Sequence, residues 1–247
     1  MTVALWGPPG CGKTTLALRM AAGLSRTSTV AVLFCDTLLP PLPVILPSAG
    51  KSILSVGGAL SSVEISAESI LRYANVLPSN GNVVLFGFGP GENCRSYPVF
   101  GEGRAASFLA ALGGLCEYLI IDCQAAASED PLCLAAMRTA DRVVRVYSPD
   151  MSSIVFYESN LRLLSEAGFD TGRHLRILNN PDAEIARPVG ETLEGMKRCD
   201  YVFPHIRALK QGYAEGRAFD IPPSRRLNHS TEMLCGFCRK GEKDNDE

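Results

Sequence analysis

The sequence carries, at residues 7–14, the stretch Gly7-Pro8-Pro9-Gly10-Cys11-Gly12-Lys13-Thr14. It fits the pattern G-x-x-x-x-G-K-[ST], which forms a phosphate-binding loop between a strand and a helix. The flanks agree, because residues 2–6 are a short apolar run typical of a buried strand and residues 15–22 have helical periodicity. The stretch therefore predicts a cradle of backbone N–H groups at a helix N-terminus, which is a binding site for phosphate.

Two side chains of this loop have predicted roles of their own. Lys13 can reach the outer phosphates of a nucleotide, and the hydroxyl of Thr14 can ligate Mg²⁺. We take the whole loop and the residue after it as the nucleotide-binding segment, which comprises Gly7, Pro8, Pro9, Gly10, Cys11, Gly12, Lys13, Thr14 and Thr15.

A second motif lies more than a hundred residues further on, where the run 117–121 ends in Asp122. A buried strand of this kind delivers one carboxylate to a metal site, so Thr14 and Asp122 are the predicted Mg²⁺ ligands. Gln124 follows where it could orient a water, although a solvated polar residue is the more ordinary interpretation. Asp36 ends the apolar run 30–35, and it is either a site residue or a turn aspartate. Lys13, Asp36 and Asp122 form the predicted catalytic set.

Composition indicates a globular protein and gives no sign of a membrane or nucleic-acid-binding protein. The chain has 247 residues, of which 46% are hydrophobic and 20% are charged, which suffices for a sizeable core. A formal net charge of -2 gives no global attraction to nucleic acid or to an anionic membrane. We find no signal peptide and no convincing membrane span, since the best run, 38–47, is short and broken by four prolines. We therefore expect a cytoplasmic protein whose nine cysteines are reduced.

Apolar runs alternate with helical patterns along the chain, which predicts an α/β fold: a doubly wound, mainly parallel sheet with helices on both faces. We expect one nucleotide-binding domain over 1–221 and a polar, disordered tail over 222–247. The tail contains Cys235 and Cys238, but no second pair of ligands is spaced to form a zinc site with them. The predicted strands cover 2–6, 30–35, 82–86, 117–122, 141–147, 175–178 and 200–204.

Four local expectations accompany this outline. The proline-broken segment 38–48 predicts an irregular loop, and the glycine-rich segment 87–103 predicts a functional loop. Residues 126–140 predict a helix with Ser128 as its cap. Later helices are predicted around Val189, Leu193 and Met196, and around Ile206, Leu209 and Tyr213.

Taken in order, these motifs resemble the ParA/MinD superfamily of P-loop ATPases, and within it the CpaE or TadZ branch that positions pilus assembly. The landmarks run from the loop through Asp122 and the turn 148–150 to Asn179 and the segment 202–216, and the resemblance covers 1–219. It implies ATP and Mg²⁺ as cofactors, a nucleotide-dependent homodimer, and a protein partner in a pilus or partition machine. It also implies that Asn179 contacts adenine, with Pro181 beside it, and that Asp36 lies in the first switch region.

One departure from the family affects the expected activity. Its members usually carry a lysine directly after the first glycine of the loop, which reaches the nucleotide of the partner subunit; here this residue is Pro8. The leading hypothesis is a slow switch ATPase. A small-molecule or nucleotide kinase is the second, with Arg95 and Arg104 as its only lid arginines, and a nucleotide-binding module without hydrolysis is the third.

Overall fold

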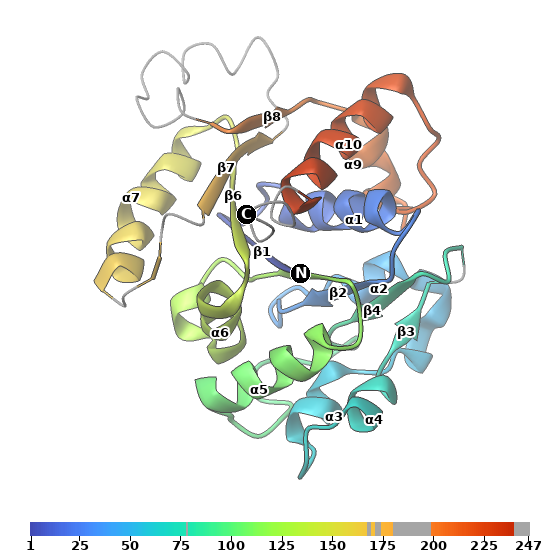
Figure 1. Ribbon diagram of the computed structural model, residues 1–247, viewed down its shortest axis with the longest axis vertical. Coiled ribbons are helices and arrows are strands. Elements are labelled where there is room, and N and C mark those ends of the chain that lie inside the picture. Colours follow the sequence, from blue (N-terminus) through green and yellow to red (C-terminus); the bar gives the residue numbers. More distant parts are fainter. Residues whose placement is uncertain (78, 167–168, 171–173, 180–198, 240–247) are drawn as a thin grey trace, which may run out of the picture.

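The computed structural model describes residues 1–77, 79–166, 169–170, 174–179 and 199–239. These residues form an eight-stranded sheet with helices on both faces (Figure 1). The strands are β1 Thr2–Trp6, β2 Val30–Phe34, β3 Asn75–Val76, β4 Val83–Phe86, β5 Tyr118–Asp122, β6 Arg142–Tyr147, β7 His174–Asn179 and β8 Tyr201–Phe203. The helices are α1 Lys13–Leu24, α2 Leu42–Ile45, α3 Val56–Ser61, α4 Ala67–Leu71, α5 Glu102–Gly113, α6 Pro131–Thr139, α7 Met151–Glu166, α9 Arg207–Ala214 and α10 Arg225–Arg239.

The strand order is β3-β4-β2-β5-β1-β6-β7-β8, and only the short edge strand β3 is antiparallel to its neighbour. The predicted doubly wound, mainly parallel sheet is thus confirmed. Strand β5 lies between β1 and β2, so that Asp122 pairs with Leu5 on one side and with Phe34 on the other. This order places the end of β5 between the loop after β1 and the residues after β2. The sheet therefore brings the two predicted motifs together.

Both faces of the sheet are buried, which explains why its strands read as continuous apolar runs. Val3 and Leu5 of β1 belong to a core shared with α1, α9 and α10. Ala4 and Trp6, which point to the other face, belong to a second core with α3, α4, α5 and α6. Figure 1 shows these two groups of helices on opposite sides of β1 and β2.

The C-terminal segment differs most from expectation. The prediction of a disordered tail from residue 222 is wrong for 225–239, which form the helix α10. The buried side chains of α10 include Leu227, Leu234, Cys235 and Cys238, which belong to the same core as α1. Burial raises the pKa of Cys235 to about 11 and that of Cys238 to about 12, so both thiols stay protonated and unreactive. Residues 240–247 lie outside the described residues.

Three smaller corrections concern local structure. Segment 38–48 is not wholly irregular, because α2 occupies Leu42–Ile45 and a 3₁₀ helix begins at Pro47. The predicted helix 126–140 consists of a 3₁₀ turn, Ala127–Glu129, and then α6, whose cap is Asp130 rather than Ser128. Asp130 Oδ1 accepts a hydrogen bond from the N–H of Cys133 at 2.8 Å. The helix predicted around Val189 lies outside the described residues.

The described part of the chain contains neither a membrane-spanning helix nor a cluster of metal ligands. None of its helices combines the length and apolar character needed to cross a membrane. Nor do three His, Cys, Asp or Glu side chains gather there in a way that could hold a metal ion, so Cys235 and Cys238 have no such partners within these residues.

Candidate functional site

The loop between β1 and α1 has the backbone that its glycines predict. Gly10 and Gly12 have positive φ angles of 74° and 92°, a region that side chains with a Cβ rarely adopt. Gly7 is required for a different reason: a Cβ there would lie 2.4 Å from the carbonyl oxygen of Val146. Strand β6 thus packs directly on the entry of the loop, and the loop conformation depends on a close approach of two backbones.

Lys13 begins α1, and its ammonium folds back over the loop. Its Nζ donates hydrogen bonds to the carbonyl oxygens of Gly7 and Pro8, each at 3.0 Å. The charge of the lysine is therefore held at the mouth of the cradle. Pro8 itself is buried, whereas Pro9 and Gly10 are exposed.

Thr14 and Asp122 meet as the two motifs predict. Thr14 Oγ1 donates a hydrogen bond of 2.6 Å to Asp122 Oδ2. The other carboxylate oxygen, Asp122 Oδ1, is buried and has no hydrogen-bond partner in the structure. Burial raises the pKa of Asp122 from 3.8 to about 6, against the lowering effects of Lys13 and of the Thr14 hydrogen bond. A buried, unsatisfied carboxylate oxygen beside a threonine hydroxyl is a donor set that suits Mg²⁺ or one of its bound waters.

Asp36 lies on the same edge of the sheet, two residues beyond β2. Its Oδ1 accepts hydrogen bonds from the N–H groups of Leu38 and Leu39 at 2.8 and 2.9 Å. Asp36 thus orders the turn that follows it, and it also faces the site: it raises the pKa of Asp122 through its charge. The two interpretations that the sequence left open for this residue, turn former and site residue, are compatible in the structure.

A cavity of about 570 Å³ joins these residues. It places the predicted catalytic set of Lys13, Asp36 and Asp122 around one space, and Gln124 lines it as well. Leu38 and Leu39 stand at this cavity with 92% and 68% of their surfaces exposed. The full lining is Pro9, Gly10, Gly12, Lys13, Thr14, Thr15, Asp36, Leu38, Leu39, Pro41, Asp122, Cys123, Gln124, Ala125, Ala126 and Tyr213.

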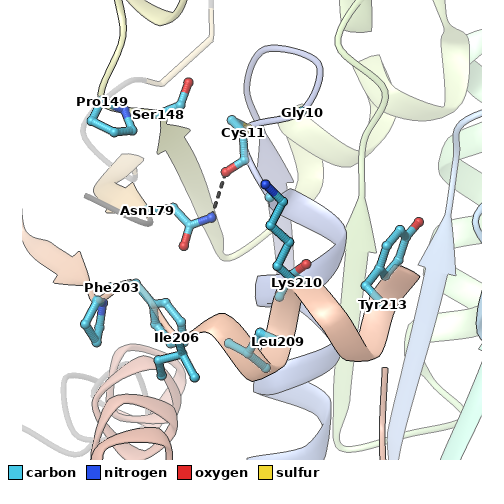
Figure 2. Close-up of a pocket in the computed structure, with 13 residues that line it drawn as sticks. Gly10, Cys11, Ser148, Pro149, Asn179, Phe203, Ile206, Leu209, Lys210 and Tyr213 are labelled. Atoms are coloured by element: carbon cyan, nitrogen blue, oxygen red, sulfur yellow. Dashed lines mark hydrogen bonds between the residues drawn. The ribbon is translucent and has the colours of Figure 1, made fainter. Parts of the chain in front are cut away.

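A second cavity, of about 240 Å³, shares Gly10, Gly12, Thr15 and Tyr213 with the first, and Figure 2 shows its lining. Asn179, at the end of β7, lines it and donates a hydrogen bond of 2.7 Å from Nδ2 to the carbonyl oxygen of Cys11. A Cβ at Gly12 would lie 2.1 Å from this nitrogen, so the glycine leaves room for the amide. The lining is Gly10, Cys11, Gly12, Thr15, Ser148, Pro149, Asn179, Phe203, Pro204, Ile206, Leu209, Lys210 and Tyr213.

The predicted nucleotide-binding residues divide between these two cavities. Thr15 lines both, Cys11 lines the smaller one, and Gly7 and Pro8 are buried and line neither. Burial raises the pKa of Cys11 to about 11, so its thiol is neutral. Pro181 lies outside the described residues.

The residues that sequence reasoning missed come from the end of β8, from α9 and from the chain between them. Phe203, Pro204, Lys210 and Tyr213 wall the smaller cavity, and Tyr213 also reaches the larger one. The sequence predicts a helix here with Ile206, Leu209 and Tyr213 on one face, but gives no sign that this face covers the phosphate loop. Only the strand order, which carries β7 and β8 past β6, brings the segment to the site.

Comparison with solved structures shows the same fold. The septum site-determining protein MinD of Pyrococcus horikoshii, solved with Mg-ADP, superposes with a TM-score of 0.67 over 100% of both chains at 18% identity. A ParA family ATPase of Chlorobium tepidum gives 0.70 over 96% of this chain and 98% of its own, at 16% identity. The fold is that of the ParA and MinD ATPases.

A third relative was solved with a partner. In the MinC:MinD cell division complex of Aquifex aeolicus, the matching chain gives a TM-score of 0.72 over 95% of this chain and 96% of its own, at 17% identity. No protein-family model and no curated protein sequence matches this chain. The similarity is therefore one of fold, at sequence identities below those that carry over a particular activity.

Proposed function

We propose that this chain is a nucleotide-dependent switch ATPase of the ParA/MinD type. The observation that carries the proposal is the hydrogen bond between Thr14 and Asp122, made where the glycine loop and Lys13 border the same cavity. Two segments 108 residues apart thus present a phosphate cradle and a metal ligand set to one space. We assign ATP to the two cavities together, with its phosphates along the loop residues Gly10, Gly12 and Thr15 that line both cavities and its base toward Asn179.

Mg²⁺ fits this site through Thr14 Oγ1 and Asp122, since Asp122 Oδ1 is buried and has no other partner. When bound, the ion would supply positive charge that offsets the negative charge of the phosphates. The protein's own residues have distinct tasks in this proposal. Lys13 leaves the carbonyls of Gly7 and Pro8 and turns its charge to the phosphates, while Asp36 or Gln124 positions the attacking water.

The biological role follows by analogy with the fold relatives. We propose a nucleotide-dependent homodimer that binds a protein partner and positions or assembles a macromolecular machine for partitioning or pilus assembly, in the cytoplasm. The MinC:MinD complex supports a protein partner for a chain of this fold. The exposed pair Leu38 and Leu39, held by Asp36 at the phosphate cavity, would let such a surface respond to the bound nucleotide.

A nucleotide-binding module with little hydrolysis is the second candidate, and one observation favours it. Pro8 replaces the family lysine and is buried. The two arginines of the glycine-rich segment could in principle supply the missing charge, but neither lines a cavity: Arg104 donates to the carbonyl oxygens of Leu60 and Ser62, and Arg95 is exposed. A kinase would need lid arginines near the phosphates. Because Arg95 and Arg104 line neither cavity, we do not favour the kinase.

Calorimetric titration of ATP with and without MgCl₂ tests the proposal. We expect Lys13→Ala to lose about 1.5–3 kcal/mol of binding free energy or more, because a charged hydrogen-bond donor to the phosphates is removed. Arg104→Ala is the matched control, since it removes one positive charge away from both cavities. Equal affinity for ATP in Lys13→Ala and wild type would contradict the assignment of the loop.

A further inference from the structure

Helix α9 forms part of the wall of the smaller cavity, and its Lys210 is a charged residue there that no sequence motif predicts. Leu209 of this helix is buried and lines the cavity from the core, and Lys210 and Tyr213 line it as well. Figure 2 shows the Lys210 side chain extending from α9 toward the loop at Gly10 and Cys11. A flexible ammonium thus borders the space where the proposed nucleotide lies.

The charges around the two cavities are unevenly distributed. Asp36 and Asp122 both lie at the larger cavity, and Lys13 is beside them. Among the residues that the structure describes, Lys210 is the one charged side chain that lines the smaller cavity. A nucleotide carries several negative charges on its phosphates. A cation close to these phosphates stabilises the bound nucleotide. Lys210 is therefore the basic group available from the side of α9.

Lys210 is also free to take such a ligand. Glu215, five residues further on at the end of α9, is already engaged, because it accepts hydrogen bonds from Gln211 and Arg217. No ion pair or side-chain hydrogen bond joins Lys210 to another of the described residues. Its ammonium would lose no internal partner on binding phosphate.

We propose that Lys210 is a cation supplied within the chain from α9, which binds the phosphate groups of the nucleotide on the Gly10–Cys11 side of the loop. This inference rests on the proposed function and adds a binding residue to it. Lys210 and the loop then hold the phosphates from two sides. The chain thereby gains, from its own C-terminal half, a positive charge that Pro8 does not provide.

The test uses Lys210→Met, Lys210→Arg and the control Arg207→Met in the full chain. Arg207 begins the same helix, is exposed and lines neither cavity. Arg207→Met therefore removes one positive charge from α9 and adds one methionine, as Lys210→Met does, but away from the proposed site. Binding of ATP, ADP and adenosine is measured by displacement of a fluorescent ADP analogue at two salt concentrations, and melting temperatures are recorded for all variants.

We expect Lys210→Met to raise the Kd for ATP and ADP about tenfold, in line with a lost charged hydrogen bond, and to leave adenosine binding unchanged. Lys210→Arg should stay within about threefold of wild type, and the salt dependence of ATP binding should weaken in Lys210→Met. Arg207→Met should match wild type. An equal loss for ATP and adenosine would mean that Lys210 only shapes the pocket, and no loss at all would also overturn the inference.

The result separates this inference from the proposed function. If wild type binds ATP and Lys13→Ala does not, while Lys210→Met binds normally, the nucleotide site stands and only the role of Lys210 fails. If wild type does not bind ATP, or if Lys13→Ala leaves binding intact, the proposed function fails and the inference about Lys210 fails with it.

Discussion

Asp122 shows how a single residue can be poorly placed for stability and well placed for a ligand. It lies at the end of a strand buried on both faces, and one of its oxygens has no partner. The cost of burying the charge appears as a pKa raised from 3.8 to about 6. Such a cost is typical of functional sites, where a ligand restores the missing interactions.

A pH-dependent stability follows from this shift. The folded state keeps the proton of Asp122 up to about pH 6, whereas the unfolded chain releases it near 3.8. The folded state thus binds more protons in this window, and its stability falls as the pH rises from about 4 to about 6. A shift of about two pKa units corresponds to at most about 3 kcal/mol.

We predict that Asp122→Asn removes this part of the pH dependence in the nucleotide-free protein. The free energy of unfolding, measured in urea between pH 4.5 and 7.5, should fall less with pH in the variant than in wild type. Addition of Mg²⁺ and ATP should stabilise wild type more than the variant, because the metal ligand is lost. Asp130→Asn separates the two effects: burial raises the pKa of that carboxyl to about 7 away from both cavities, so this variant should also weaken the pH dependence but should keep the full stabilisation by Mg²⁺ and ATP. Parallel curves for wild type and Asp122→Asn would contradict the prediction.

Among the elements, the central strands and the loop are the ones that the sequence predicts well. A parallel strand buried on both faces is expected to be apolar along its buried length, and the runs at 3–6, 30–34 and 118–121 are apolar. The glycine loop is predictable because its backbone angles and close approaches restrict the residues that fit. In both cases the residues of the segment itself are enough to predict its conformation.

Helix α10 was missed because its buried face is chemically inconspicuous. Its buried positions include Ser230 and Thr231 and two cysteines as well as Leu227 and Leu234, so the apolar stripe is weak in a polar sequence. The helix is held by packing on α1 rather than by its own composition. The role of α9 at the site was missed for a related reason, since it depends on where β8 ends rather than on any local motif.

The contact of α10 with α1 gives a prediction at this scale. A Cβ at Gly23 would lie 2.4 Å from Cys235 Sγ and 2.7 Å from Thr231 Cγ2. Alanine ordinarily stabilises a helix by about 1 kcal/mol relative to glycine. Here we expect Gly23→Ala to destabilise the protein by about 1–3 kcal/mol, because the two helices must move apart.

Thermal and urea unfolding check this effect against a matched variant. Gly103 lies in the first turn of α5, and a Cβ there has no neighbour within 4 Å. Gly103→Ala should therefore leave stability unchanged or raise it, whereas Gly23→Ala lowers it. If both substitutions raised stability alike, α10 would not be packed on α1 as described.

At the scale of the whole molecule, the question is how the proposed ATPase would work without the lysine that follows the first loop glycine in the superfamily it resembles. Pro8 is buried and uncharged, so a second copy could not use this residue to insert a cation into its neighbour's site. Lys13 and the backbone cradle remain for binding. Under the proposed function, ATP can therefore still bind and a dimer can still form, while the step that needs an extra positive charge is slow.

We predict slow hydrolysis whose rate per chain does not depend on protein concentration. A cation supplied by a partner contributes about 10³–10⁵ in rate to related nucleotidases, so its absence should hold turnover far below the range of about 1–100 s⁻¹ known for kinases. Single-turnover hydrolysis is measured across a range of protein concentrations in which light scattering shows monomer and then dimer, with ATP binding measured in parallel. Arg95→Ala and Arg104→Ala should hydrolyse ATP at the wild-type rate, since neither arginine lines a cavity. A rate that rises as the dimer forms would reveal a residue contributed by the second copy, and fast turnover in both arginine variants would show that the chain has another source of charge for the reaction.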